Sequence, residues 1–252
     1  MELSVFNYGN YSILYPAFYF QFLKEVFILD VYRTNLLKPN DTVLDLGAST
    51  GDFSIIASKK VGKDGIVIAV EPNFESFEIL QLNIKKNNCE NVIPLNIAVG
   101  DEEFREKQIT FWGKTCSCKV STLENIADSL KIDGKIDFIK MDIEGFEADV
   151  IRKSISLIKD TGILSIEFHQ TKEKIDELLL PHGFDFEPVT MRYIYKKIVM
   201  NLLLHPVNLS RVYVDTIRKN PQVLAKAVTG FDMTKKNLLV GSYIKRNDKD
   251  NL

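Results

Sequence analysis

Short apolar runs alternate with longer amphipathic stretches through most of this 252-residue chain. Apolar runs of this kind are typical of parallel strands buried on both faces. The amphipathic stretches between them have helical spacing and predict helices. We therefore expect an α/β fold with a doubly wound, mostly parallel, Rossmann-like sheet. The expected strands are Thr42–Leu46, Ile66–Val70, Asn91–Val99, Asp137–Met141, Gly162–Phe168, Phe184–Pro188 and Leu238–Lys245.

Turn residues and capping signals place the helices between these strands. One helix should follow the first strand, and a second should cover Phe74–Asn87. The sequence Ser121-Thr122-Leu123-Glu124 fits a capping box and predicts a helix over Thr122–Leu130. The stretch Glu102–Lys119 has no clear periodicity, and we expect it to be irregular apart from one strand around Gln108–Trp112.

The two ends of the chain differ from this alternating core. Residues 1–35 are rich in aromatic side chains, and we expect an N-terminal helical segment whose helices lie between about Ala17 and Tyr32. Residues 36–250 should form the main domain, with a basic helical insertion at about 189–232. No charged residue occurs between Glu2 and Lys24, but Pro16 and several polar residues interrupt that stretch. We therefore expect neither a membrane span nor a signal peptide.

The most informative stretch is TVLDLGASTGDF, which begins at Thr42. A buried strand that leads through Gly47 and Gly51 into a helix opens a nucleotide-binding βαβ unit. Asp45 and Asp52 bracket this turn and would repel a pyrophosphate, which prefers amides and a helix N-terminus. They favour a nucleoside that carries a cationic amino group, such as S-adenosylmethionine. Alternatively, Asp45 caps turn amides and Asp52 is a first-turn acid that suits the helix dipole.

Further polar residues follow the next two strands. Glu71 lies about 20 residues beyond the glycine turn, where a carboxylate can accept both ribose hydroxyls. Pro72 ends the strand there and a helix follows, which favours this role over that of an ordinary surface acid. Asn96 and Ala98 should lie near the carboxyl end of the third strand, beside the crevice in which open α/β sheets bind ligands.

Acids and one histidine follow the fourth and fifth strands. Asp142, Glu144 and His169 are the candidates for a general base, and His169 is preferred because its unperturbed pKa suits proton abstraction near neutrality. The alternative is that His169 caps its strand. Asp142, Glu167 and His169 could together hold Mg²⁺ or Mn²⁺, but we rank metal-free catalysis higher. Lys140, on an apolar strand, should pair with one of these acids.

Composition adds few constraints. The net charge of −2 and the pI near 6.0 give no general attraction for nucleic acid or an anionic membrane. Three cysteines are too few for a disulfide framework in a chain of this length, so a cytoplasmic location is the simplest interpretation. The oligomeric state is left open.

Several separated blocks together resemble the FkbM family of S-adenosylmethionine-dependent methyltransferases. The resemblance covers roughly residues 25–169 and implies a class I methyltransferase fold, whose seven-stranded sheet has an antiparallel last strand. It also implies methyl transfer to a hydroxyl of a sugar, glycan or small metabolite. Ser49-Thr50 departs from the residues that family members often carry. The blocks are VLDLGASTGDFS, AVEPNFESFEIL, NIAVGD, STLEN, FIKMDIEGFE and LSIEFH.

The resemblance extends to individual positions. It implies that Asp142, Glu144 and Gly145 match a conserved acidic block at the mouth of the fourth strand. The predicted catalytic residues are His169, Asp142 and Glu144, with no metal. The predicted S-adenosylmethionine-binding residues are Asp45, Gly47, Ala48, Ser49, Gly51, Phe53, Glu71, Pro72, Asn73, Asn96, Ala98 and Asp142.

Two other functions are kept as alternatives. The chain could methylate a ribose 2′-hydroxyl of RNA through Lys140, Asp142 and Glu167, with the basic insertion contacting the backbone. The acidic net charge and the lack of a recognised RNA-binding module argue against this reading. The chain could also be a non-catalytic partner subunit that binds S-adenosylmethionine.

Overall fold

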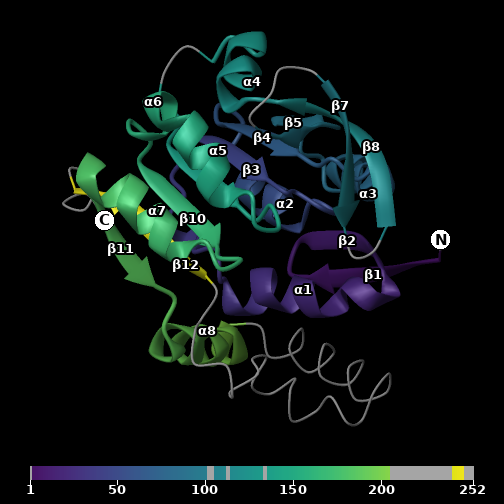
Figure 1. Cartoon of the computed structure of the whole chain (residues 1–252). Helices are drawn as coiled ribbons and strands as arrows, with labels where there is room; N and C mark the ends of the chain where they lie inside the picture. Colours follow the sequence, from purple (N-terminus) through teal and green to yellow (C-terminus); the bar gives the residue numbers. More distant parts are fainter. Residues whose placement is uncertain (1, 101–104, 112–113, 133–134, 205–239, 247–252) are drawn as a thin grey trace.

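A computed structural model describes residues 2–100, 105–111, 114–132, 135–204 and 240–246 (Figure 1). Its centre is a seven-stranded sheet with the order β11-β12-β10-β9-β3-β4-β5. All neighbouring strands are parallel except β12, which runs antiparallel to both β10 and β11. The strands are β3 (Thr42–Leu46), β4 (Ile66–Val70), β5 (Val92–Leu95), β9 (Phe138–Met141), β10 (Ile163–Glu167), β11 (Phe184–Pro188) and β12 (Val240–Lys245).

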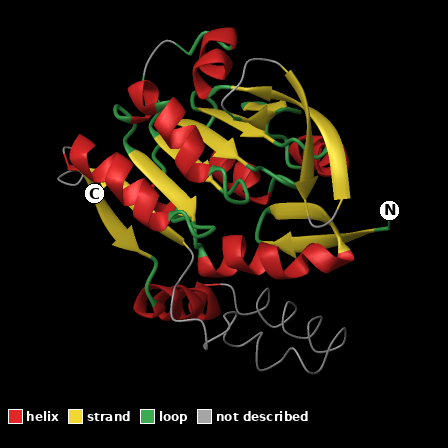
Figure 2. Cartoon of the chain, in the orientation of Figure 1, coloured by secondary structure: helices red, strands yellow, loops and turns green. Residues whose placement is uncertain are grey.

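This sheet confirms the predicted α/β fold of the class I methyltransferases. Helices cover both faces, so the molecule has three layers (Figure 2). Side chains alternate along each strand: Val43 packs with α2 on one face, and Leu44 packs with α4 and α5 on the other. The helices are α2 (Asp52–Val61), α3 (Phe74–Lys86), α4 (Leu123–Ser129), α5 (Glu147–Lys153), α6 (Ile155–Ile158) and α7 (Lys172–Leu179).

Helix starts follow the capping signals in the sequence. The Asn73 side chain accepts a hydrogen bond from the Ser76 amide and caps α3. Thr122 caps α4 in the same way by accepting from the Asn125 amide. Such caps satisfy amides that have no partner within the first turn of a helix.

The N-terminal segment has helices between Ala17 and Leu29, within the range that we had expected, but a hairpin that we had not predicted precedes them. It begins with an antiparallel hairpin of β1 (Leu3–Tyr8) and β2 (Tyr11–Pro16). The described helices of the segment then follow: η1 (Ala17–Tyr19), α1 (Phe20–Lys24), η2 (Glu25–Leu29) and η3 (Thr34–Leu36). The hairpin is attached to α3, because the Asn83 side chain accepts from the Leu14 amide and donates to the Leu14 carbonyl.

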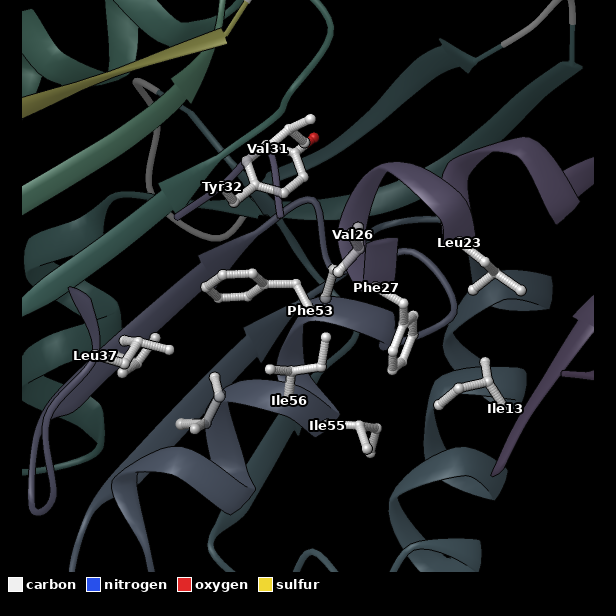
Figure 3. Packing of buried hydrophobic residues seen from close by; sticks show 14 of the residues in the cluster. Ile13, Leu23, Val26, Phe27, Val31, Tyr32, Leu37, Phe53, Ile55 and Ile56 are labelled. Atoms are coloured by element: carbon white, nitrogen blue, oxygen red, sulfur yellow. The ribbon is translucent and has the colours of Figure 1, made fainter. Parts of the chain in front are cut away.

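The helical part of this segment packs directly over α2. Val26 and Phe27 belong to the same buried cluster as Ile55 and Ile56 of α2, with Ile13 of the hairpin at its margin (Figure 3). Phe27 contacts several aromatic rings of the hairpin, including Phe6 at a centroid distance of 5.3 Å. Most of the N-terminal aromatic residues are therefore core contacts.

The stretch after β5 also differs from expectation. The strand predicted over Asn91–Val99 is divided, because β5 ends at Leu95 and the short β6 (Ala98–Val99) pairs with β8 in a separate three-stranded sheet. The expected irregular region 102–119 contains the antiparallel pair β7 (Arg105–Phe111) and β8 (Lys114–Ser121). The single strand predicted around Gln108–Trp112 is thus one arm of a hairpin.

The predicted helical insertion is described only in part. Helix α8 (Met191–Leu204) falls within it, and residues 205–239 lie outside the described part of the chain. β12 coincides with the strand expected at Leu238–Lys245 and is the antiparallel strand of the sheet. Within the described ranges, no helix is both long and apolar enough to cross a membrane.

Candidate active site

A buried lysine lies where β3 and β9 end. Lys140 is the register partner of Asp45, so the two side chains lie on one face of neighbouring strands. The Lys140 Nζ atom lies 3.2 Å from Asp45 Oδ1 and 3.9 Å from Asp142 Oδ2. It also donates to the Gly47 carbonyl oxygen at 2.6 Å. The expected pairing is present with Asp142, but the nearer partner is Asp45, which we had not predicted. Lys140 thus joins the first strand to the glycine turn.

The two turn glycines are required by the fold itself. Gly47 and Gly51 have φ values of +77° and +86°, a region that favours glycine. A Cβ atom on Gly47 would lie 1.9 Å from the Asp142 carbonyl oxygen, and one on Gly51 would lie 2.5 Å from a Leu80 methyl group. The space that a side chain would need at both positions is therefore occupied by the protein itself.

Glu71 connects the glycine turn to the start of α3. Its Oε2 accepts from the Ser49 amide and its Oε1 from the Asn73 amide, both at 2.7 Å. Burial raises the pKa of this carboxyl to about 7. The Asn96 side chain donates to the carbonyl oxygens of Glu71 and Pro72 at 2.9 and 3.2 Å. The structure therefore brings together five residues predicted to bind the cofactor.

Other predicted cofactor residues have little surface. Asp45 and Phe53 have no exposed area, and Ala48 and Ala98 are also buried. Asp45 accepts a hydrogen bond from the Ser54 hydroxyl, while the Phe53 ring packs against Tyr32 and Phe138. In this geometry, Asp45 and Phe53 can influence a ligand only through the residues that they support.

His169 is held by a buried carboxylate. Its Nδ1 lies 2.9 Å from Oε1 of Glu147, a fully buried residue in the first turn of α5. Glu147 also accepts from the Gly145 amide at 2.9 Å and from the Thr171 hydroxyl at 3.0 Å. These contacts fix the imidazole, so its Nε2 lies 3.6 Å from Glu144 Oε2 and 4.0 Å from Asp142 Oδ1. The three predicted catalytic residues therefore meet at one point.

The same contacts change the acidity of His169. The hydrogen bond with Glu147 is the main cause that raises the pKa of His169 to about 9. We had expected a value near neutrality, and this expectation was wrong because it left out Glu147. The charges of Asp142 and Glu167 act in the same direction. The turn at Glu144 and Gly145, which have φ values of 56° and 99°, packs beside His169.

Glu167 does not face the histidine as a metal ligand would. Its Oε2 lies 2.9 Å from the Tyr32 hydroxyl, which also lies 3.0 Å from Asp142 Oδ2. Among the described residues, the group close enough to share a metal ion is Asp142, Glu144 and His169, whose ligand atoms lie within 4.8 Å of one another. The possible metal ligands that we considered from the sequence are therefore wrong at one position, because Glu144 and not Glu167 joins Asp142 and His169.

Sequence reasoning missed Glu147 and Tyr32 as members of the site. Glu147 carried a usable signal, because it lies two residues beyond Gly145 in a run of acids at a helix start. Tyr32 carried none, since it is 110 residues from Asp142 in the chain and belongs to an aromatic-rich segment to which we assigned no part in the site.

Buried carboxyls dominate this edge of the sheet. Burial raises the pKa of Glu25 to about 8 and the pKa values of Asp52, Glu71 and Glu167 each to about 7. Lys140 and His169 lie among these carboxyls, and Lys24 lies near Glu25, so the described carboxyls outnumber the cations beside them. An unbalanced set of buried carboxyls is suited to a cationic ligand. S-adenosylmethionine fits this set, because it carries a sulfonium and an ammonium group.

The sheet order, with the antiparallel β12 between β10 and β11, is that of the class I methyltransferase fold. Residues 45–192 match the Methyltransferase FkbM domain, and the chain belongs to this family. The family implies S-adenosylmethionine as the cofactor, in agreement with the sequence prediction. Glu71, whose carboxylate is held by the Ser49 and Asn73 amides, would accept hydrogen bonds from the ribose hydroxyls of this cofactor.

Two curated relatives show how far the similarity extends. The hexuronic acid methyltransferase AglP of Haloferax volcanii is 28% identical over 152 residues, which are 56% of this chain and 62% of AglP. The ribosomal RNA large subunit methyltransferase E of Methanobrevibacter smithii is 53% identical over 41 residues, 16% of this chain and 20% of that protein. This chain therefore spans less than two thirds of either relative.

Solved methyltransferases are also similar to the chain. The precorrin-6y C5,15-methyltransferase of Geobacter metallireducens is 20% identical, with a TM-score of 0.44 over 63% of this chain and 71% of that structure. An S-adenosylmethionine-dependent O-methyltransferase of Thermotoga maritima is 17% identical, with a TM-score of 0.40 over 69% of this chain and 54% of that structure.

Proposed function

We propose that this methyltransferase transfers the methyl group to a hydroxyl of a sugar, glycan or small metabolite. The observation that carries the proposal is the orientation of His169, whose Nδ1 is held by buried Glu147 while Nε2 lies between Asp142 and Glu144. A carboxylate that orients an imidazole is the usual arrangement of a histidine base. A hydroxyl is the acceptor that needs such a base before it can attack.

Each residue at the mouth of the site has a role in this proposal. S-adenosylmethionine supplies an electrophilic methyl group when it is bound. His169 Nε2 takes the proton of the acceptor hydroxyl, and Glu147 stabilises the imidazolium that forms. Asp142 and Glu144 accept hydrogen bonds from hydroxyl groups and fix the acceptor. Such positioning can supply several kcal/mol of the barrier reduction, and a general base adds about 10²- to 10⁴-fold in rate.

A sugar acceptor is supported by two observations. AglP, which is similar over more than half of this chain, is named as a hexuronic acid methyltransferase. Two partly exposed carboxylates beside one histidine also provide several acceptors for neighbouring hydroxyl groups of one sugar ring.

Methylation of RNA is the second candidate and rests on the short similarity to ribosomal RNA methyltransferase E. It requires Lys140 to act at the mouth of the site. However, Lys140 is only 4% exposed and its ammonium group is engaged by Asp45 and the Gly47 carbonyl. A lysine in this position supports the fold and has little surface left for a ribose.

The test combines binding with turnover. Calorimetry should show that the chain binds S-adenosylmethionine, and transfer of radiolabelled methyl groups should follow with hydroxylated sugars as acceptors. Binding without turnover on any hydroxylated acceptor would favour the alternative of a non-catalytic partner subunit. Transfer to ribosomal RNA with none to sugars would favour the RNA reading.

Replacing Glu71 with glutamine should weaken S-adenosylmethionine binding by about 10- to 100-fold, since a charged acceptor contributes roughly 1.5–3 kcal/mol. The glutamine amide would also place a donor against the Ser49 or Asn73 amide, which both donate to Glu71. Calorimetry measures the affinity. The control is Glu78→Gln, an exposed change of the same kind in α3. Equal affinity of the two variants for S-adenosylmethionine would show that Glu71 does not bind the cofactor.

Treatment with EDTA should leave methyl transfer unchanged. Asp142, Glu144 and His169 are close enough to share a divalent cation. However, an imidazole whose pKa is raised to about 9 is protonated at neutral pH, and its proton competes with a metal ion. Activity is measured before and after chelation and dialysis. If activity is lost and added Mg²⁺ or Mn²⁺ restores it, the metal-free mechanism is wrong.

A further inference from the structure

Tyr32 lies between two carboxylates that come from different strands. Its hydroxyl is 3.0 Å from Asp142 Oδ2, at the end of β9, and 2.9 Å from Glu167 Oε2, at the end of β10. One hydroxyl can contact both oxygens only from a position between them. The tyrosine therefore fixes the distance between the two carboxylates and the direction in which each one faces.

The ring of Tyr32 is itself held on both sides. It makes an edge contact with Phe53 at a centroid distance of 6.0 Å, and the Lys140 Nζ atom lies 5.1 Å from its centroid. Tyr32 is only 5% exposed, so the hydroxyl has little freedom to leave the carboxylates. Figure 3 shows the ring beside Phe53, at the margin of the buried cluster.

The backbone around Tyr32 is also fixed by distant elements. Asp30 and Arg33, on either side, have positive φ values of 51° and 56°. Asp30 accepts from the Tyr193 hydroxyl of α8 at 3.0 Å, and Arg33 pairs with Glu187 of β11 at 2.8 Å. Contacts of this kind hold a left-handed turn that is costly for residues other than glycine. These contacts therefore fix the position of Tyr32.

Without this hydroxyl, Asp142 would have a different preferred partner. Its Oδ2 already lies 3.9 Å from the Lys140 ammonium, whereas its Oδ1 lies 4.0 Å from His169 Nε2. A carboxylate released from Tyr32 can turn toward the lysine and away from the histidine. Repulsion between the two freed carboxylates favours the same movement.

We propose that Tyr32, which precedes the residues 45–192 that match the FkbM domain, is a positioning residue that holds Asp142 and Glu167 at the mouth of the active site. The inference rests on the proposed function, because Asp142 must face the acceptor hydroxyl beside His169. The tyrosine acts through these carboxylates and does not touch the reacting atoms.

The test is Tyr32→Phe, compared with Tyr243→Phe. Tyr243 is fully buried and donates to Asp176 at 2.7 Å, so the control also removes one tyrosine–carboxylate hydrogen bond. We expect Tyr32→Phe to lower kcat by about 10²-fold while the affinity for S-adenosylmethionine stays within about twofold of the unmodified protein. Tyr243→Phe should leave kcat unchanged even though it lowers the thermal midpoint. Equal kcat values in the two variants would overturn the proposal.

A second measurement does not depend on activity. Tyr32→Phe and Glu167→Gln are combined in a double-mutant cycle of thermal midpoints, and a direct link between the residues predicts shifts that do not add. Additive shifts would overturn the proposal. If the unmodified protein transfers no methyl group to any hydroxyl, the proposed function fails, and the cycle still decides whether Tyr32 holds Glu167.

Discussion

Replacing Lys140 with methionine should lower the free energy of unfolding by about 3–5 kcal/mol, since it removes one partner of a buried ion pair. Methionine fills nearly the same volume as lysine, so the loss of stability measures the effect of removing the charge rather than of leaving a cavity. The fully buried Asp45 would keep the Ser54 hydroxyl as a partner but lose the ammonium group 3.2 Å away. The Gly47 carbonyl would lose a donor at the same time. Urea unfolding at neutral pH measures the effect.

The matched control for this prediction is an exposed ion pair. Arg152 pairs with Asp149 at 2.6 Å, with more than half of each side chain accessible, and Arg152→Met should cost less than about 1 kcal/mol. Adding Asp45→Asn to Lys140→Met should recover part of the lost stability, because no uncompensated charge then remains buried. A loss for Lys140→Met no larger than for Arg152→Met would show that the buried pair contributes little.

The strands that could be predicted are those whose burial produces a clear pattern of apolar residues in the sequence. β3, β4 and β9 are buried on both faces, so their residues are mostly apolar and the strands are easily recognised, although Asp45 interrupts β3 and Lys140 interrupts β9. The N-terminal hairpin was missed because the residues before Ala17 were described only by their aromatic composition and not examined for strand alternation. Its signal was the Gly9-Asn10 pair, a typical two-residue hairpin turn in which Gly9 has a φ of +55°.

The candidate site was predictable where it depends on topology. Asp142, Glu144 and His169 follow neighbouring parallel strands, and the carboxyl ends of such strands meet at one edge. The pairing of Lys140 was expected, but its main partner Asp45 depends on strand register, which the sequence does not display. Glu147 and Tyr32 reach the site through a helix start and a distant turn. The high pKa of His169 was not anticipated because Glu147, its main cause, was not assigned to the site.

Replacing His169 with alanine should lower kcat by about 10²- to 10⁴-fold, the usual contribution of a general base. The affinity for S-adenosylmethionine should be retained, because the predicted nucleoside contacts at Glu71 lie on another strand. Steady-state kinetics and calorimetry separate the two effects. The control is His182→Ala, an exposed histidine at the end of η4 (Leu180–His182). Undiminished turnover in His169→Ala would move the role of the base to Asp142 or Glu144.

The pH dependence tests the same residue in the unmodified protein. Only neutral imidazole accepts a proton, and a pKa of about 9 leaves roughly 1% of His169 neutral at pH 7. The value of kcat should therefore rise with pH, about tenfold per unit, and level off near pH 9. Glu147→Gln removes the main cause of the raised pKa, so the rising limb should move to lower pH. If the rising part of the pH profile does not move in Glu147→Gln, a group other than His169 controls the pH dependence of kcat.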